Sequence, residues 1–207
     1  TINNCHNHIV INSDINIGGI AGETDANATI ENCTNSASIT KTNSVVGHCG
    51  GIVGYCEGDI NGSKNYGSIS ANNSGGIAGQ LRATGTINNC SNHAGLNAFV
   101  NIGVADLVVG GITGRNRGEI YNSYNDTTGK IEVEHRISGV ETNAGCIYRG
   151  GIAGANYNKL EKSYNLADVS GKSYDNDPNT IEDIVCVGGI VGINYVDGML
   201  ATINNCY

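Results

Sequence analysis

Eight cysteines carry the most obvious chemical potential in this chain of 207 residues. Cys146 and Cys186 lie shortly before equivalent points of two neighbouring repeats, and they are the pair for which we consider a disulfide. Four other cysteines share one motif position, at which the remaining repeats have serine: Cys5, Cys33, Cys90 and Cys206, with Ser63, Ser123 and Ser163. A position that accepts either cysteine or serine favours small side chains. We therefore expect these four cysteines to be buried and to pack as small hydrophobic groups.

Metal ligation is the second chemistry that histidine and cysteine could supply. His48, Cys49 and Cys56 offer three soft ligands. Cys49 and Cys56 would, however, lie up to about 20 Å apart on an extended strand, too far to share one ion. The acidic loop at 175–183 offers hard oxygen ligands, but it lacks the spacing and the closing glutamate of an EF-hand. We therefore predict no metal site and no cofactor.

Catalytic motifs are not evident in the sequence. It contains no HExxH zinc-protease motif, no GxSxG nucleophile elbow and no phosphate-binding loop. Solenoid hydrolases and lyases of polysaccharides cluster carboxylates on one strand face. Here charged residues make up only 14% of the chain and are scattered. We predict no catalytic residue, and a carbohydrate-processing enzyme is the less favoured alternative.

Tyrosines recur at two positions of the repeat. Tyr124, Tyr164 and Tyr207 follow the cysteine/serine column in three repeats, and Tyr157 and Tyr195 share another position in neighbouring repeats. Such columns could stack on sugar rings or dock a partner chain. They could equally stack on one another and only stabilise the fold. We take these five residues as a candidate face for a glycan or protein partner, of host or microbial origin.

A glycine block, Gly-Gly-Ile-x-Gly, occurs six times and must position all of these residues. Successive copies start 25 to 40 residues apart, and self-similarity at such a period indicates a solenoid or a related repeat array. A second motif, Ile-x-Asn-Cys/Ser, follows each block, and a third segment ends in Ile, Leu or Val. The isoleucines of the six blocks are Ile20, Ile52, Ile77, Ile112, Ile152 and Ile190.

Each repeat indicates three very short strands joined by turns. No segment has the apolar spacing of a helix, and Asn and Gly crowd the junctions, where they accept left-handed backbone angles. Strands that pair with the same strand of the next repeat form a parallel sheet, and parallel crossovers are nearly always right-handed. The sequence therefore predicts an all-β, right-handed parallel β-solenoid (β-helix) with three short strands per coil. We expect one domain over residues 1–207, with six to seven coils and inserted loops.

Strand alternation predicts which side chains of the glycine block point inward and which point outward. If each isoleucine points inward in a straight strand, the fourth residue of the block points outward. We therefore expect an inward aliphatic ladder of six isoleucines and an outward stripe of small residues, which inserted loops or another chain would cover. The alternative is the reverse arrangement, in which the isoleucines point outward. The stripe would comprise Ala21, Val53, Ala78, Thr113, Ala153 and Val191.

Charge and length exclude some partners. The net charge of −8, with no basic run, disfavours nucleic-acid binding. No stretch is long and apolar enough to span a bilayer. Both ends of the chain fall inside a copy of the second motif, so we expect an excerpt or mature fragment of a longer array. Uncapped solenoid ends would allow self-association.

The segment Gly110 to Asn125, GGITGRNRGEIYNSYN, resembles the GLUG repeat. The resemblance covers all seven units, but not the loops before each glycine block. GLUG-like arrays occur in large secreted or surface-anchored microbial proteins, including adhesin-like proteins and the non-catalytic part of IgA-specific metalloproteases. The resemblance implies a non-enzymatic, extracellular or cell-surface module that serves as a stiff stalk or in cell adhesion. A subunit of an extracellular filament, assembled by end-to-end stacking, is the alternative.

Overall fold

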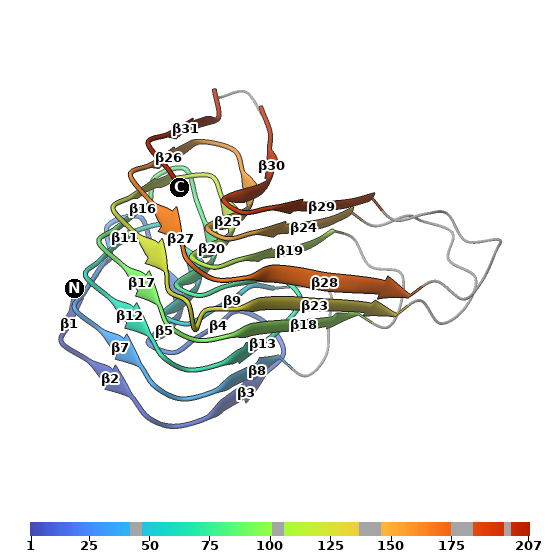
Figure 1. The fold of residues 1–207 in the computed structure, drawn as a ribbon. Coiled ribbons are helices and arrows are strands. Elements are labelled where there is room, and N and C mark those ends of the chain that lie inside the picture. Colours follow the sequence, from blue (N-terminus) through green and yellow to red (C-terminus); the bar gives the residue numbers. More distant parts are fainter. Residues whose placement is uncertain (42–46, 101–105, 137–145, 175–183, 197–199) are drawn as a thin grey trace.

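The computed structural model describes residues 1–41, 47–100, 106–136, 146–174, 184–196 and 200–207. Within these ranges every regular element is a β-strand, and no helix long and apolar enough to cross a membrane occurs among them. The coils are stacked one on another from the N-terminal end, drawn in blue, to the C-terminal end, drawn in red (Figure 1).

Five parallel sheets run along the stack, since each complete coil contributes one short strand to each of them. Sheet 1 contains β4 (Ile17–Gly18), β9 (Cys49–Gly50), β14 (Ser74–Gly75), β19 (Leu107–Gly110), β24 (Cys146–Gly150) and β29 (Ile184–Gly188). Sheet 2 contains β5 (Ala21–Thr24), β10 (Val53–Cys56), β15 (Ala78–Leu81), β20 (Thr113–Asn116), β25 (Ala153–Asn156) and β30 (Val191–Asn194).

The remaining three sheets complete each coil. Sheet 3 contains β1 (Ile2–Asn3), β6 (Thr29–Glu31), β11 (Asp59–Asn61), β16 (Thr86–Asn88), β21 (Glu119–Tyr121), β26 (Lys159–Glu161) and β31 (Thr202–Asn204). Sheet 4 contains β2 (His6–Asn7), β7 (Thr34–Asn35), β12 (Lys64–Asn65), β17 (Ser91–Asn92), β22 (Tyr124–Asn125) and β27 (Tyr164–Asn165). Sheet 5 contains β3 (Ile11–Ser13), β8 (Ile39–Lys41), β13 (Ile69–Ser70), β18 (Leu96–Val100), β23 (Ile131–Arg136) and β28 (Val169–Tyr174).

The fold is the right-handed parallel β-solenoid that the sequence predicts, and the three expected strand segments of each coil can be recognised in it. Bends divide two of these segments. The glycine block bends at its second glycine and isoleucine, between sheets 1 and 2. The Ile-x-Asn-Cys/Ser motif bends between sheets 3 and 4 at a residue with positive φ, such as Asn32 at 52° or Asn89 at 54°. Asparagine tolerates this left-handed conformation better than most residues, which explains its recurrence there.

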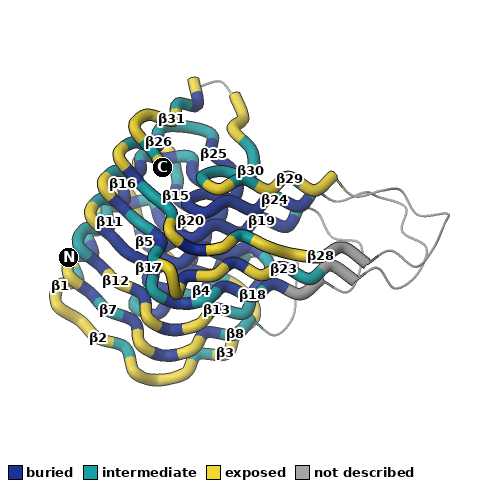
Figure 2. The backbone as a smooth tube through the Cα atoms, in the orientation of Figure 1, coloured by how far each residue is buried: buried dark blue, intermediate teal, exposed yellow. Residues whose placement is uncertain are grey.

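The interior contains two apolar clusters. The first lies between sheets 2 and 3 and includes Ile52, Ile60 and Ile87, all fully buried. The second lies between sheets 1 and 5 and includes Ile39, Val109 and Ile131. Burial is greatest in the middle coils, and exposed backbone predominates at the two ends of the stack (Figure 2).

An asparagine ladder separates the two clusters. Its members are Asn7, Asn35, Asn65, Asn92, Asn125 and Asn165, the second residues of the sheet 4 strands. Each Nδ2 donates to Oδ1 of the asparagine in the next coil at 2.8–2.9 Å, from the first member to the last. The same Nδ2 also donates to a nearby main-chain carbonyl, so these buried amides are satisfied.

The second glycine of each block leaves the space that the asparagine side chains of this ladder occupy. A Cβ atom at Gly76 would overlap the side chain of Asn92 and the carbonyl oxygen of Gly111. Gly111 stands in the same relation to Asn125. The two motifs of the repeat are therefore complementary in shape, because the missing side chain of one is filled by the amide of the other.

The isoleucines of the glycine blocks stack in one column. Ile52 N–H donates to the carbonyl oxygen of Ile77 at 3.0 Å, and Ile77 N–H donates to Ile112 at 2.9 Å. The four central isoleucines are fully buried, and Ile20 and Ile190, at the two ends of the column, are partly buried.

The expected outward stripe is wrong. Val53 and Ala78 are fully buried in the first apolar cluster, and Ala21 and Val191 pack against it. Thr113 and Ala153 are also fully buried. The physical reason is the bend at Gly-Ile. A bent chain does not keep the alternation of a straight strand, so the third and fourth residues both face the interior.

Candidate functional site

The column of Tyr124, Tyr164 and Tyr207 is a self-stacking ladder on sheet 4. The ring centroids of Tyr124 and Tyr164 lie 5.0 Å apart with the ring planes 4° from parallel. Tyr164 and Tyr207 lie 5.2 Å apart at 7°. Parallel rings this close must overlap, because coplanar neighbours would collide. Both faces of Tyr164 are therefore covered by tyrosine, and a sugar ring cannot stack on it.

Ser91, His93 and Asp126 form a hydrogen-bonded chain beside this ladder that sequence reasoning missed. Nε2 of His93 lies 2.9 Å from Ser91 Oγ, and its Nδ1 lies 2.8 Å from Asp126 Oδ2. The pKa of the Asp126 carboxyl is lowered by the hydrogen bond from the Thr127 main-chain N–H and by the one from His93. The only signal in the sequence is register: Asp126 takes the position of His93 one coil later.

The geometry of this chain resembles a serine nucleophile with its base, but it lacks two requirements. Ser91 is only 2% exposed, and Tyr66 stacks on the His93 ring at 4.7 Å. The N–H groups of Ser91 and His93 donate to carbonyl oxygens of the previous coil. They are therefore not available as an oxyanion hole. As it stands, the arrangement ties two coils together.

The cysteine/serine column has a hydrogen-bonding role as well as a packing role. The N–H of Cys33 donates to Ser63 Oγ, and the N–H of Cys90 donates to Ser123 Oγ, each at 3.1 Å. Small side chains with an acceptor atom fit this column because they satisfy the backbone of the coil before. Cys33 and Cys90 are fully buried as expected, whereas Cys5, in the first coil, is exposed, and Cys206, in the last, is partly buried. Burial raises the pKa of the Cys90 thiol to about 12, so it is neutral and unreactive at pH 7.

The disulfide considered between Cys146 and Cys186 is not present; both are free thiols. The strand register aligns Cys146 with Ile184 and Cys186 with Tyr148. An offset of two residues adds about 6.6 Å along the strand to the spacing of about 4.8 Å between strands. The resulting Cα separation exceeds the range of about 4.4–6.8 Å in which a disulfide forms.

The soft ligands considered for zinc point in three directions. Cys49 is buried in the second apolar cluster, and Cys56 is buried in the first. His48 instead faces Tyr55, with 5.8 Å between ring centroids. Among the described residues no group of three or more His, Cys, Asp or Glu could hold a metal ion. The acidic loop at 175–183 lies outside the described residues.

Tyr157 and Tyr195 line an open pocket on a different side of the coil, where sheets 1 and 2 face each other. The two sheets are close because the fifth residue of each glycine block has no side chain. A Cβ at Gly154 would lie 2.7 Å from Val108 Cγ1 and 2.8 Å from the main-chain nitrogen of Val109. Side chains beyond this close approach diverge, and in the upper coils they leave a depression.

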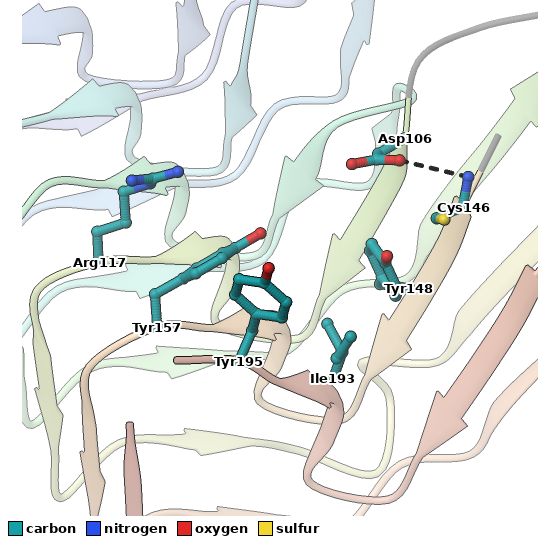
Figure 3. A pocket seen from close by; sticks show the side chains of 7 residues that line it. All are labelled: Asp106, Arg117, Cys146, Tyr148, Tyr157, Ile193 and Tyr195. Atoms are coloured by element: carbon teal, nitrogen blue, oxygen red, sulfur yellow. Dashed lines mark hydrogen bonds between the residues drawn. The ribbon is translucent and has the colours of Figure 1, made fainter. Parts of the chain in front are cut away.

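We call this depression the tyrosine pocket. Its volume is about 430 Å³, in the range of small-ligand sites. Figure 3 shows the tyrosine rings and Ile193 on the two sheets turned toward one another, with Asp106 and Cys146 at one side and Arg117 at the other. The lining residues are Asp106, Arg117, Cys146, Tyr148, Tyr157, Ile193 and Tyr195.

The rings in the tyrosine pocket do not form a closed stack. Tyr157 and Tyr195 meet edge to face, with centroids 5.7 Å apart and planes at 67°. The ring that presents its edge keeps both faces clear of the other tyrosine. Tyr195 is 52% exposed. A planar or ring-shaped ligand can therefore reach an aromatic face here, which it cannot do on the sheet 4 ladder.

Polar groups in the pocket are fixed by short-range contacts. The N–H of Cys146 donates to Asp106 Oδ1 at 3.3 Å. Asp106 Oδ2 lies 3.8 Å from Nη2 of Arg115. The guanidinium of Arg117 lies over the Tyr157 ring, 4.8 Å from its centroid. A hydrogen bond with the Cys146 thiol, together with burial, raises the pKa of the Tyr148 phenol, so Tyr148 remains a neutral donor.

Arg149 is a second feature that the sequence did not reveal. It is 1% exposed and lies behind the pocket, on the interior side of β24. Burial lowers the pKa of its guanidinium. A Cβ on Gly171 would collide with Nη1 of Arg149, so this glycine of sheet 5 provides the space that the long side chain occupies.

The parallel coils, the bends and the recurring ladders define a β-solenoid repeat protein. Residues 13–40, which run from the end of β3 to β8 and make up one coil, match the family model of the GLUG motif. The match confirms, for this coil, the GLUG repeat predicted from the sequence. No curated protein and no solved structure matches the chain.

Proposed function

We propose that this domain is a non-enzymatic structural and adhesive module that acts outside the cell, and that it presents the tyrosine pocket as a glycan-binding site on a stiff stack of coils. A solenoid suits this task because each coil is fastened to its neighbours along its whole perimeter.

Stiffness is supported by the continuity of the ladders. Main-chain bonds, the isoleucine column and the asparagine ladder all pass from coil to coil through the middle of the stack. Asn65 and Asn92, at the centre, are fully buried and fully bonded. Buried polar networks with every partner in place are rigid and specify one arrangement.

The observation that carries the binding proposal is the contrast between two sets of tyrosines. Tyr164 has both ring faces covered, whereas Tyr157 and Tyr195 meet edge to face at the rim of an open pocket. Aromatic faces beside hydrogen-bonding groups are the usual means by which proteins hold sugar rings.

A glycan array with the purified domain tests the proposal. We expect binding to a subset of glycans and its loss, by at least tenfold in affinity, in Tyr157→Ala and Tyr195→Ala. The matched control is Tyr164→Ala, which removes a tyrosine from the self-stacking ladder and should leave binding unchanged. Equal loss in all three variants, or no binding by the native domain, would rule out the assigned pocket.

The proposed extracellular location follows from the GLUG-motif match at residues 13–40, and the burial of half of the thiols permits it. Four of the eight cysteines, Cys33, Cys49, Cys56 and Cys90, are fully buried. Burial raises the pKa of Cys49 to about 12 and that of Cys56 to about 11, which protects these thiols from oxidation and exchange. Labelling of intact producing cells with an antibody to the domain checks the location; signal only after permeabilisation would contradict it.

End-to-end assembly into a filament is the second candidate, and the parallel pairing of the coils favours it. Each sheet strand pairs in parallel with the same strand of the next coil, and a second molecule could continue this pairing. Stacking of one molecule on another would cover both ends. Electron micrographs at high protein concentration should then show fibres whose length grows with concentration. Rods of one fixed length at every concentration would exclude the filament.

A further inference from the structure

The tyrosine ladder of sheet 4 holds the phenol rings of Tyr124, Tyr164 and Tyr207 at a fixed spacing. Tyr124 and Tyr164 are direct partners in the parallel register of β22 and β27. Tyr207 continues the column, because its N–H donates to the Ser163 carbonyl and its own carbonyl accepts from the N–H of Asn165. The ring centroids, 5.0 and 5.2 Å apart, therefore stay neighbours for as long as the coils stay stacked.

Parallel stacking also aligns the ring atoms at which phenoxyl radicals couple. The unpaired electron of such a radical is shared by the oxygen and by the ring carbons ortho and para to it. In tyrosine the side chain blocks the para carbon, so carbon–carbon coupling takes place at the ortho carbons. Their π lobes project from the face of the ring. In a stack whose planes are only 4° and 7° from parallel, these lobes point at the neighbouring ring.

Tyr207 gives an oxidant access to the ladder. It is 74% exposed at the C-terminal end of the stack, whereas Tyr124 and Tyr164 are half-buried. An electron taken from Tyr207 leaves a radical that the rings stacked beneath it can refill. Burial raises the pKa of Tyr164, and the neighbouring tyrosines raise it further. The phenol is therefore neutral at pH 7, and its oxidation releases the hydroxyl proton together with the electron.

A disulfide cannot link in-register positions of neighbouring coils in this solenoid. Their Cβ atoms lie about 4.8 Å apart, whereas a disulfide needs about 3.8 Å. Cys5 and Cys33, which occupy adjacent coils of the cysteine/serine column, are accordingly free thiols. A bond between two tyrosine rings has a longer span, because a ring separates each Cβ from the bonded carbon. The tyrosine ladder can therefore be joined covalently where the cysteine/serine column cannot.

We propose that the tyrosine ladder is an oxidative cross-linking site, at which a peroxidase acting with hydrogen peroxide joins Tyr164 to Tyr124 or to Tyr207 through a dityrosine bond. Each of the two phenols gives up one electron and its hydroxyl proton, and the two phenoxyl radicals form one bond between ortho carbons. The hydrogen on each bonded carbon then moves to the oxygen of its ring, which restores both phenols. The two hydrogen atoms lost overall go to hydrogen peroxide, whose O–O bond breaks to give two water molecules.

The bond between Tyr164 and Tyr207 would fasten the last coil to the stack. Its strand β31 pairs with a single neighbour, β26, at the edge of sheet 3. A covalent link from this coil to the one before it restricts the unfolded chain, as a disulfide does. The inference does not depend on glycan binding, because the tyrosine pocket contributes no residue to the tyrosine ladder.

The experiment treats the purified domain with a haem peroxidase and hydrogen peroxide, reduces any disulfides and maps the linked peptides by mass spectrometry, with dityrosine fluorescence as a second readout. We expect links from Tyr164 to Tyr124 and to Tyr207. Each should be at least tenfold more abundant than a link between Tyr157 and Tyr195, whose planes meet at 67° and whose π lobes are not aligned. The yield per molecule should stay constant over a tenfold range of protein concentration, because neighbours in a stack react at a very high effective concentration.

Phenylalanine variants keep the stacked rings and remove the phenol oxygens, so they test the site without opening the ladder. Tyr164→Phe should abolish both links. Tyr124→Phe should leave only the link to Tyr207, and Tyr207→Phe should leave only the link to Tyr124, formed more slowly because the most exposed phenol is gone. Tyr66→Phe is the control. Tyr66 is 48% exposed, but its ring stacks on His93 and not on a tyrosine, so this variant should give both links unchanged.

Three results would overturn the proposal: links that form only between molecules and grow with concentration, a Tyr157–Tyr195 link as abundant as those of the ladder, or a native yield of dityrosine in Tyr164→Phe. Limited proteolysis then tests the consequence. The oxidised domain should lose its C-terminal coil at least fivefold more slowly than the untreated domain, and oxidised Tyr207→Phe should gain no such protection. Equal rates in the oxidised and untreated domain would show that the bond does not fasten the last coil.

Discussion

Two sides of the same coils differ in how regularly their residues repeat and in how completely their buried polar atoms are hydrogen-bonded. On the sheet 4 side, the asparagine ladder and the tyrosine ladder repeat from coil to coil, and the amides of the asparagine ladder have partners. On the side of sheets 1 and 2, residues change from coil to coil. Among the described residues, the buried side-chain nitrogen and oxygen atoms without a hydrogen-bond partner all lie on or beside these two sheets: His48 Nδ1, Arg115 Nε, Asn116 Oδ1, and Nε and Nη2 of Arg149.

Asn116 shows how the difference arises. It begins a short second ladder, in which Asn116 Nδ2 donates to Asn156 at 2.7 Å and Asn156 donates to Asn194 at 2.8 Å. The coil below has Leu81 at the same register position, which offers no donor to Asn116 Oδ1. The sheet 4 side therefore holds the coils together, whereas the side of sheets 1 and 2 varies in sequence and contains buried polar atoms without a hydrogen-bond partner. Ligand specificity can change on the second side without loss of the fold.

The largest expected effect on this comparison comes from Gly111→Ala. The added Cβ would overlap the Gly151 carbonyl oxygen and the Asn125 side chain, neither of which can move without breaking the ladder. We expect a loss of unfolding free energy of more than about 4 kcal/mol, or no soluble protein. Gly189→Ala is the control, because it lies at the same position of the last block with nothing within 4 Å of the new Cβ. Chemical denaturation should show almost no change for Gly189→Ala; equal losses would contradict the shape argument.

Asn92→Ala should have the next largest effect. It removes the acceptor of Asn65 and the donor to Asn125 in the middle of the asparagine ladder, and it leaves buried polar groups unpaired. The expected loss in unfolding free energy is about 2–4 kcal/mol. Asn7→Ala, at the exposed end of the same ladder, should cost less than about 1 kcal/mol. A similar cost at both positions would show that the ladder is not cooperative.

His48→Asn tests the pocket side through pH. Because the pKa of His48 is about 4 in the folded protein and about 6.5 in the unfolded chain, protons bind the unfolded chain preferentially. Its contribution to stability is present above pH 6.5 and is lost as the pH falls toward 4, by about 2 kcal/mol after allowance for partial exposure.

Asparagine is the natural replacement for His48, since Asn16 and Asn73 occupy the same position in the coils on either side. Melting temperatures of the wild type and the variant between pH 7 and pH 4 should diverge, with the variant losing less. His8→Asn, at an exposed position, serves as the comparison. Parallel curves for the wild type and His48→Asn would contradict the buried, neutral histidine.

The smallest effect is expected from the tyrosines, and it separates the two sides most cleanly. Tyr164→Ala removes two stacking contacts and should lower the unfolding free energy by about 1 kcal/mol, with no change in ligand binding. Tyr195→Ala should do the reverse, with a small change in stability and a loss of binding. Stability and affinity that fall together in both variants would erase the distinction between the two sides.

The stack itself was predictable from sequence because its determinants are local and repeated. Gly-Gly-Ile recurs in each coil at spacings of 25 to 40 residues, and this recurrence predicts one stacked column of isoleucines, in which Ile77 and Ile112 are fully buried. The inward facing of Val53 was not predictable by strand alternation, because the bend at Gly-Ile interrupts it. The pocket was missed because Asp106 and Tyr157 come from opposite sides of that bend and from different coils. An alignment of the repeats by the residue after each sheet 2 strand would have shown that Tyr157 and Tyr195 share a column with Arg82 and Arg117.

The asparagine ladder also gives the molecule a direction. Every amide donates toward the C-terminal end and accepts from the N-terminal end, from Asn7 through to Asn165. The aligned dipoles reinforce one another as they do in a chain of hydrogen-bonded amides. A further coil, whether from the same polypeptide or from a second molecule, can extend this series only head to tail. A two-fold symmetric junction would set donor against donor at one end, or acceptor against acceptor at the other.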